Sequence, residues 1–288
     1  MISLRQLEIF LAIAECGSTT RAADQVMLSQ SAISNALAEL ESRLGVQLFD
    51  RVGKRLVLND AGRRLQPRAR LLMVQAHELD GLFVDTRGRL AIGASTTIGN
   101  YLLPRLLGLA GVEHPCNRVE IANTEVIAGQ VARCELDIGL VEGLTRQPEL
   151  ELSHWRDDEM VVVAAAASHW ARAQTGLERM PWIMREQGSG TRSVVEDEFP
   201  ELSAAAVRLE LGSSEAIHHA VLAGLGISCL SRQVVERSLH TGELVQLVPE
   251  RSIRRPLYIL RHRQRPDTAA IRALMQLLGV SETKKACI

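Results

Sequence analysis

The chain has 288 residues, of which 46% are hydrophobic and 23% charged, and its formal net charge at pH 7 is −1. This composition is typical of a globular protein of about two domains, and the near-zero charge excludes an indiscriminate polyanion binder. No apolar run approaches the ~20 residues of a membrane span, and the N-terminus does not have the pattern of a secretory signal. We therefore expect a cytoplasmic protein without a membrane partner.

The five cysteines are scattered, odd in number and without a C-x-x-C pair. This usage indicates a reducing compartment and no metal framework. We expect neither a metal nor a cofactor, and no single cysteine stands out as a redox sensor.

The N-terminal segment predicts a helix over residues 4–16 and then two short helices joined by a tight turn. Ser18 and Ser29 are placed to cap these two helices, and Gly17 and Gly45 stand where helices end in the left-handed conformation. The second short helix is apolar on one face, at Ile33, Leu37, Leu40 and Leu44. Its start and opposite face carry short donors and acceptors suited to base edges in a major groove: Ser29, Gln30, Ser31, Ser34 and Asn35. The pattern predicts a recognition helix; the alternative is the polar surface of an ordinary three-helix domain.

The residues after Gly45 alternate between apolar and polar around Gly53–Lys54, which predicts a hairpin. A hairpin directly after a recognition helix would be a wing, with Arg51, Lys54 and Arg55 contacting phosphates. Eight basic and two acidic residues lie between Arg43 and Arg70, a balance that favours phosphate contacts. The alternative is a solvated charged surface.

Residues 59–85 have the pattern of one long helix. Apolar residues follow a heptad spacing: Leu65, Ala69, Leu72, Ala76, Leu79 and Phe83. A helix of roughly 40 Å is longer than a small domain can bury, so we expect dimerisation through it. Pro67 should kink or interrupt its first turns. The alternative is a long helix that lies on its own chain.

The remaining residues alternate between short strands and helices, which predicts a parallel α/β fold. They could form two lobes joined by crossing strands. The expected strands are 89–95, 119–125, 137–143, 160–166, 181–185, 206–212, 226–231 and 256–262. The expected helices are 100–110, 126–134, 191–199, 214–224, 232–240 and 267–279.

This order resembles the LysR-type transcriptional regulators over essentially the whole chain. The string LRQLEIFLAIAECGSTTRAADQVMLSQSAISNALAELESRLGVQLFDRVGKRLVLNDAGRRL carries the resemblance at the DNA-binding end. In the second half it is carried by ASTTIGNYLLP, DIGLVEG, REQGSGTR and SEAIHHAVLAGLGISCLS.

The resemblance implies an α+β N-terminal winged helix-turn-helix over 1–58, a long linker helix over 59–87, and a two-lobed α/β effector domain over 88–288, like periplasmic solute-binding proteins. Lobe I would comprise about 88–161 and 257–288, and lobe II about 162–256. The resemblance also implies a small-molecule effector between the lobes. Dimers or tetramers would bind an interrupted palindrome of double-stranded DNA, with RNA polymerase as a candidate further partner.

Open α/β sheets bind ligands at the carboxyl ends of their strands. The residues at these ends predict the effector contacts: Ser95, Thr96, Thr97, Asn123, Thr124, Glu142, Gly188, Ser189, Gly190 and Thr191. Free N–H groups and hydroxyls at helix starts favour anions, so we hypothesise a small anionic effector, an inorganic oxyanion or a carboxylate. The segments GSTT, STTIGNYLLP and REQGSGTR resemble the subgroup that responds to sulfur oxyanions and cysteine precursors. The alternative is that each hydroxyl is an ordinary helix cap.

A second class of function is an enzyme or a small-molecule-binding protein without DNA function. The Gly-Ser-Gly-Thr loop matches neither a nucleophile elbow nor a P-loop, so we expect no enzyme. His218 and His219 are adjacent on a helix and point about 100° apart, which favours a structural role. Arg192 would either neutralise an anion or pair with Glu196.

Overall fold

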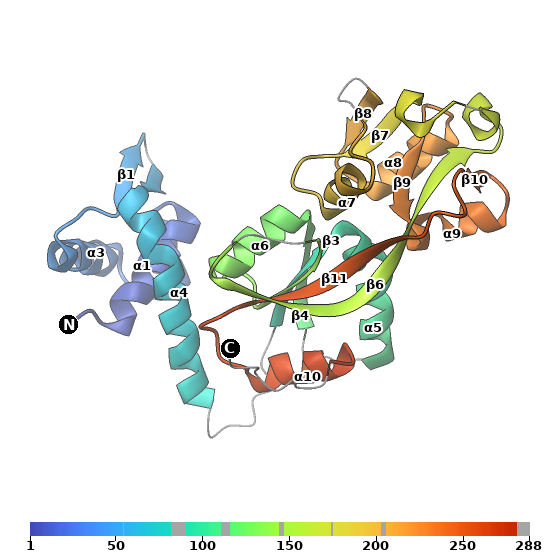
Figure 1. The fold of residues 1–288 in the computed structure, drawn as a ribbon. Helices are drawn as coiled ribbons and strands as arrows, with labels where there is room; N and C mark the ends of the chain where they lie inside the picture. The colour runs from blue at the N-terminus through green and yellow to red at the C-terminus, as the bar shows by residue number, and fades with distance from the viewer. Residues whose placement is uncertain are drawn as a thin grey trace. The chain divides into compact units, whose positions relative to one another are not determined.

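The computed structural model describes residues 1–53, 55–81, 90–110, 116–143, 147–173, 175–202 and 206–280. The chain divides into two compact units, one formed mainly by residues 1–86 and the other mainly by residues 87–288 (Figure 1). The domain and lobe boundaries given above stay predictions.

The N-terminal unit is a winged helix-turn-helix, as the sequence predicts. Its elements are α1 (Leu4–Cys16), α2 (Thr19–Gln25), α3 (Gln30–Leu44), β1 (Phe49–Val52), β2 (Arg55–Leu58) and α4 (Asp60–Gly81). β1 and β2 pair antiparallel with Val52 opposite Arg55, which confirms the predicted hairpin. The core contains Phe10, Ile13, Ile33, Leu40 and Leu48, each at most 1% exposed. Burying side chains of this size contributes about 1.5–3 kcal/mol each.

The predicted helix ends of this unit are confirmed with one exception. Gly17 and Gly45 adopt the left-handed conformation at φ 63° and 69°, and the Ser29 hydroxyl accepts from the Ala32 N–H at 3.2 Å. Ser18 stands at the N-cap of α2, but its side chain makes no capping bond. The short α2 is held instead by packing of Ala22 and Ala23 in the core.

Pro67 does not interrupt the helix, because α4 runs continuously from Asp60 to Gly81; the kink stays a prediction. A proline removes one helical hydrogen bond, and packing on both sides of Pro67 offsets that loss. Leu65 packs against the helix-turn-helix core, and Ala69 is fully buried within it. The first part of the predicted seam therefore belongs to the core of its own chain.

The second part of the seam is exposed. The exposed fractions are 48% for Leu72 and 65% for Leu79, and Phe83 lies outside the described residues. No helix in the described parts of the chain combines the length and apolarity needed to cross a membrane.

The second unit is built on a mixed sheet of seven strands in the order β10-β6-β11-β5-β3-β4, with β9 paired to β6. These strands are β3 (Leu90–Ser95), β4 (Cys116–Ala122), β5 (Ile138–Glu142), β6 (Leu150–Ala165), β9 (Ser228–Ser231), β10 (Leu244–Gln246) and β11 (Ile253–His262). A smaller parallel sheet pairs β7 (Trp182–Arg185) with β8 (Val207–Leu211). The helices are a π-helix (Ile98–Leu102), α5 (Leu103–Ala110), α6 (Thr124–Ala132), α7 (Gly190–Glu198), α8 (Ser214–Leu222), α9 (Arg232–His240) and α10 (Ala269–Leu277), with 3-10 turns at His169–Arg172 and Leu177–Arg179.

The long strands β6 and β11 run side by side from one lobe to the other (Figure 1). One lobe has its core around Ile92, Leu140 and Ile259. The other lobe has two cores, around Trp182 and Val221, on opposite sides of the β6 residues 160–165.

The predicted parallel α/β fold is confirmed for part of the strands, but the main sheet is mixed. β3 pairs parallel with β4 and β5, but β6 and β11 pair antiparallel with each other and with their other neighbours. Two strands that cross between lobes in opposite directions must pair antiparallel. The strand expected at 160–166 is the end of β6. The first half of β6 is largely half-exposed and carries charged residues, so it has no apolar run that would predict a strand.

Candidate functional site

The exposed face of α3 carries the predicted base-reading residues. Ser29, Gln30, Ser31 and Asn35 are exposed, and Ser34 is half-buried. The opposite face is fixed in the core by Ile33, Leu37 and Leu40. The structure thus presents a polar helix face on a rigid support, a geometry that suits entry into a major groove.

The hairpin presents two of the three predicted wing residues. Arg51 and Arg55 are exposed on β1 and β2, whereas Lys54 lies outside the described residues. Part of the basic patch is already neutralised, because Arg63 pairs with Asp60 at 2.5 Å and Arg70 pairs with Glu15 at 3.3 Å. The free positive charge is therefore smaller than the sequence count suggests.

The predicted effector residues at the end of β3 are largely enclosed. Ser95 and Thr97 are 1% and 2% exposed, and Thr96 is half-buried. The Ser95 hydroxyl has no hydrogen-bond partner within the described residues. A buried hydroxyl without a partner costs roughly 1–3 kcal/mol, so a ligand acceptor here would be stabilised.

Asn123 and Thr124 lie at the start of α6. Asn123 caps this helix, since its Oδ1 accepts from the Val126 N–H at 3.0 Å. Thr124 donates from its hydroxyl to the Glu142 carbonyl at 2.8 Å. The amide nitrogen of Asn123 donates to another partner, Glu186, at 3.2 Å.

The loop Gly188–Thr191 brings the second lobe against the first. The Gly188 carbonyl accepts from the Glu125 N–H at 3.2 Å, and Gly188 has φ +80°. A Cβ on Gly190 would stand 2.2 Å from the Glu142 carbonyl oxygen. The two glycines thus permit close contact between the lobes. Ser189 is buried, and its hydroxyl has no partner in the described part of the chain.

Arg255 on β11, which the sequence did not nominate, organises a buried charge network. It is fully buried, and its Nη1 lies 3.0 Å from Glu142 Oε2, while Nη2 pairs with Asp158 on the neighbouring strand. Nη1 also donates to the Thr191 hydroxyl at 2.8 Å, and Nη2 to the Thr97 hydroxyl at 3.5 Å.

Burial lowers the pKa of Arg255, but Glu142 and Asp158 raise it by more, so this side chain stays charged. Three predicted effector residues, Thr97, Glu142 and Thr191, are therefore engaged with Arg255. Arg255 is held by Asp158 on the neighbouring strand β6. A contact between two strands that are distant in the sequence cannot be recognised from residue spacing.

Arg185, at the end of β7, is a second arginine that the sequence did not nominate. Its Nε and Nη2 each donate to the Glu186 carboxylate at 2.8 Å. Nη1 donates to the Ser214 hydroxyl at 3.1 Å, and Nη2 to the Thr96 hydroxyl at 3.3 Å. Burial raises the pKa of Glu186, but the hydrogen bonds from Arg185, the backbone and Asn123, together with the positive charge of Arg185, hold the pKa below its ordinary value. The signal in the sequence that could have identified Arg185 is a basic residue at the carboxyl end of a predicted strand.

The remaining side chains considered in the sequence have structural partners. Arg192 donates to Glu196 at 2.8 Å and also pairs with Glu210. His218 lies 3.0 Å from the Ser238 hydroxyl, and burial lowers its pKa. Across the described ranges, no cluster of three or more His, Cys, Asp or Glu side chains could hold a metal ion.

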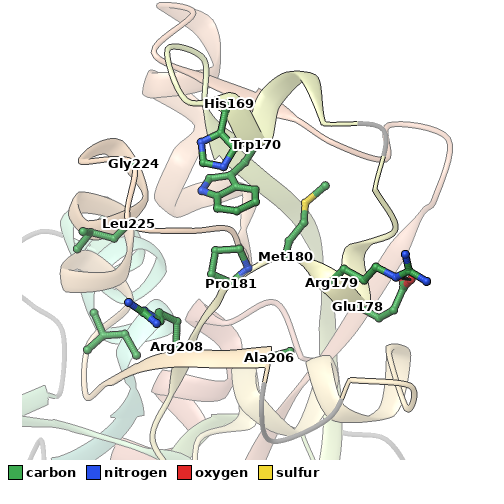
Figure 2. A pocket seen from close by; sticks show the side chains of 11 residues that line it. His169, Trp170, Glu178, Arg179, Met180, Pro181, Ala206, Arg208, Gly224 and Leu225 are labelled. Atoms are coloured by element: carbon green, nitrogen blue, oxygen red, sulfur yellow. Dashed lines mark ion pairs between the residues drawn. The ribbon is translucent and has the colours of Figure 1, made fainter.

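A separate pocket of about 770 Å³ opens on the lobe that carries β7 and β8 (Figure 2). Trp170 and Pro181 line it, with Arg208 at one side and the Glu178–Arg179 pair at the other. It shares no residue with the predicted effector contacts.

Comparisons with known proteins agree with this architecture. The family model "Bacterial regulatory helix-turn-helix protein, lysR family" matches residues 4–63, and the model "LysR substrate binding domain" matches residues 85–280. The chain is 45% identical over 284 residues to the uncharacterised HTH-type transcriptional regulator YeiE of Escherichia coli K12, covering 95% of this chain and 96% of that protein.

The chain is also similar to solved structures. A full-length OxyR variant of Pseudomonas aeruginosa has a TM-score of 0.76 at 23% identity and covers 96% of this chain and 98% of its own; this likeness shows the fold. The regulatory domain of CcmR from Synechocystis PCC6803, in complex with 2-PG, has a TM-score of 0.58 at 29% identity and covers 68% of this chain and 99% of its own.

Proposed function

The chain belongs to the LysR family of bacterial transcriptional regulators, and from this premise we propose that it binds an interrupted palindrome as a dimer or tetramer and responds to a small anion between its lobes. The family consists of regulators, so the chain is not an enzyme. A regulator that binds bacterial chromosomal DNA acts in the cytoplasm. RNA polymerase is a candidate partner.

The exposed polar face of α3 is the observation that carries DNA binding. Gln30 and Asn35 project from a helix whose other face is locked in the core. Amide side chains can pair bidentately with adenine, and Arg51 and Arg55 on the hairpin suit phosphates. We therefore propose Ser29, Gln30, Ser31, Ser34 and Asn35 as base-reading or positioning residues, with the wing residues beside them.

Replacing Asn35 or Gln30 with alanine should weaken operator binding by ~1–3 kcal/mol and relax base preference. The measurement is a gel shift with promoter DNA in rising salt, in which affinity should fall log-linearly. Asn117→Ala is the matched control, because Asn117 is an exposed asparagine on β4. Unchanged discrimination in the Asn35 and Gln30 variants would contradict the recognition-helix assignment.

The exposed leucines of α4 support dimerisation through this helix. Leu72 and Leu79 keep 48% and 65% of their surface exposed in the single chain. They are spaced seven residues apart, as on the seam of a coiled coil. A second copy of α4 would cover both.

Leu72→Glu should weaken the dimer about thirtyfold, the equivalent of ~2 kcal/mol, because both partners would lose apolar contact and gain a charge. Sedimentation over a concentration series measures this change. Leu225→Glu is the control, because Leu225 is similarly exposed, at 54%, but lies at the pocket on the lobe that carries β7 and β8 rather than on α4. A dimer as tight as the wild type would show that the partner helix packs elsewhere.

The convergence of hydroxyls and a buried guanidinium at the lobe junction supports an anionic effector. Ser95 and Ser189 offer unpartnered buried hydroxyls among the described residues, and Thr96 contacts Arg185. The CcmR regulatory domain, solved with 2-PG, supports a small molecule in this domain. The proposed contacts are Ser95, Thr96, Thr97, Asn123, Thr124, Glu142, Gly188, Ser189, Gly190 and Thr191.

A further inference from the structure

The guanidinium of Arg185 is a buried cation among the proposed effector contacts. Its side chain is 1% exposed, and it is held by neutral hydroxyls from two lobes, Ser214 and Thr96. Hydroxyls do not neutralise a charge, and a buried cation needs a negative partner.

The negative partner of Arg185 is the carboxylate of the next residue. Glu186 accepts both parallel hydrogen bonds of the guanidinium fork at 2.8 Å, and it also accepts from the Asn123 amide at 3.2 Å. Its side chain is 26% exposed. Donors proposed for the effector are thus occupied by a carboxylate that can reach solvent.

We propose that Arg185 is the anion-binding residue of the effector site, and that Glu186 occupies its guanidinium until an external anion displaces it. This inference rests on the proposed anionic effector and names the cation and the competitor. Arg185 is fixed by its burial, whereas Glu186 can turn outward to water. The exchange replaces one anion with another, so the buried guanidinium always keeps a negative partner.

Competition with Glu186 selects the class of ligand. A carboxylate attached to the neighbouring residue has a high effective concentration at the guanidinium. A free monovalent carboxylate offers the same two oxygens, so it binds the guanidinium no more strongly than the Glu186 carboxylate does. A doubly charged oxyanion interacts more strongly with the guanidinium and has further oxygens for hydroxyl donors such as Ser95 and Ser189. The ligand class is therefore a small doubly charged oxyanion.

Calorimetric titration of the full-length chain with sulfate, phosphate and acetate at constant ionic strength tests this inference. The wild type should bind sulfate or phosphate more tightly than acetate. Glu186→Gln should bind the oxyanions about tenfold more tightly than the wild type, which corresponds to ~1.4 kcal/mol. The double variant Arg185→Gln, Glu186→Gln removes both charges together and should lose this binding.

Glu159→Gln is the matched control, because Glu159 accepts a similar two-point contact from Arg232 on the surface; it should titrate as the wild type does. An unchanged oxyanion affinity in Glu186→Gln overturns the competition but leaves an anionic effector standing. Binding by the double variant as tight as by Glu186→Gln overturns the role of Arg185. Acetate binding as tight as sulfate overturns the ligand class. If neither the wild type nor Glu186→Gln binds any of the three anions, both the inference and the anionic effector fail.

Discussion

Replacing Arg255 with methionine should lower the stability of the effector domain by about 3–5 kcal/mol, because it leaves two buried carboxylates without their cation. Glu142 and Asp158 have side chains only 2% and 5% exposed, and both pair with Arg255. Methionine fills much of the arginine's volume, so the loss would report charge more than cavity formation. The change would also release the Thr97 and Thr191 hydroxyls from Arg255.

Urea unfolding followed by tryptophan fluorescence measures this loss. All three tryptophans, Trp155, Trp170 and Trp182, lie in the effector domain, so the signal reports that domain alone. Adding Glu142→Gln and Asp158→Asn to the methionine variant should recover part of the stability, since neutral amides carry a smaller desolvation cost. A loss below about 1 kcal/mol for Arg255→Met alone would show that water or local movement compensates the carboxylates.

Features of the fold that depend on local signals could be predicted from the sequence. The helix-turn-helix is specified by capping residues, by glycines at φ 63° and 69°, and by one apolar helix face. Each of these acts within a few residues of the chain. The sequence analysis missed β10 and the first half of β6, which are specified instead by pairing with distant strands. β10 is too short, and the first half of β6 too polar, to be recognised as a strand from its own residues.

For the proposed effector site, the sequence indicates which strand ends come together but not which side chains pair there. The carboxyl ends of β3, β5 and β7 do meet at the lobe junction, as the α/β rule implies. Residue spacing could not show that Arg255 forms an ion pair with Glu142. Nor could it show that Arg185 donates a hydrogen bond to Thr96, which is 89 positions away in the chain. The long helix is confirmed, but its heptad spacing does not separate two roles: Ala69 packs in the core of its own domain, whereas Leu72 stays exposed.

Gly190→Ala should destabilise the effector domain by about 3 kcal/mol, because the added methyl group would overlap backbone. Its Cβ would lie 2.2 Å from the carbonyl oxygen and 2.7 Å from the carbonyl carbon of Glu142. A flexible side chain could move aside, but here the start of α7 must shift away from the end of β5, and overpacking of this kind costs ~1–3 kcal/mol or more. Thr191 would move with it and lose its contacts with Glu142 and Arg255.

Gly212→Ala is the matched control for this prediction. Gly212 lies in the same lobe, and an added Cβ would meet nothing within 4 Å, so its stability should stay within about 0.5 kcal/mol of the wild type. The same fluorescence-detected urea unfolding compares the two variants. Because the shift of α7 would separate Ser189 from the first lobe, Gly190→Ala should also weaken oxyanion binding while Gly212→Ala does not. Equal stability of the two alanine variants would mean that the lobes do not close on Gly190 in solution.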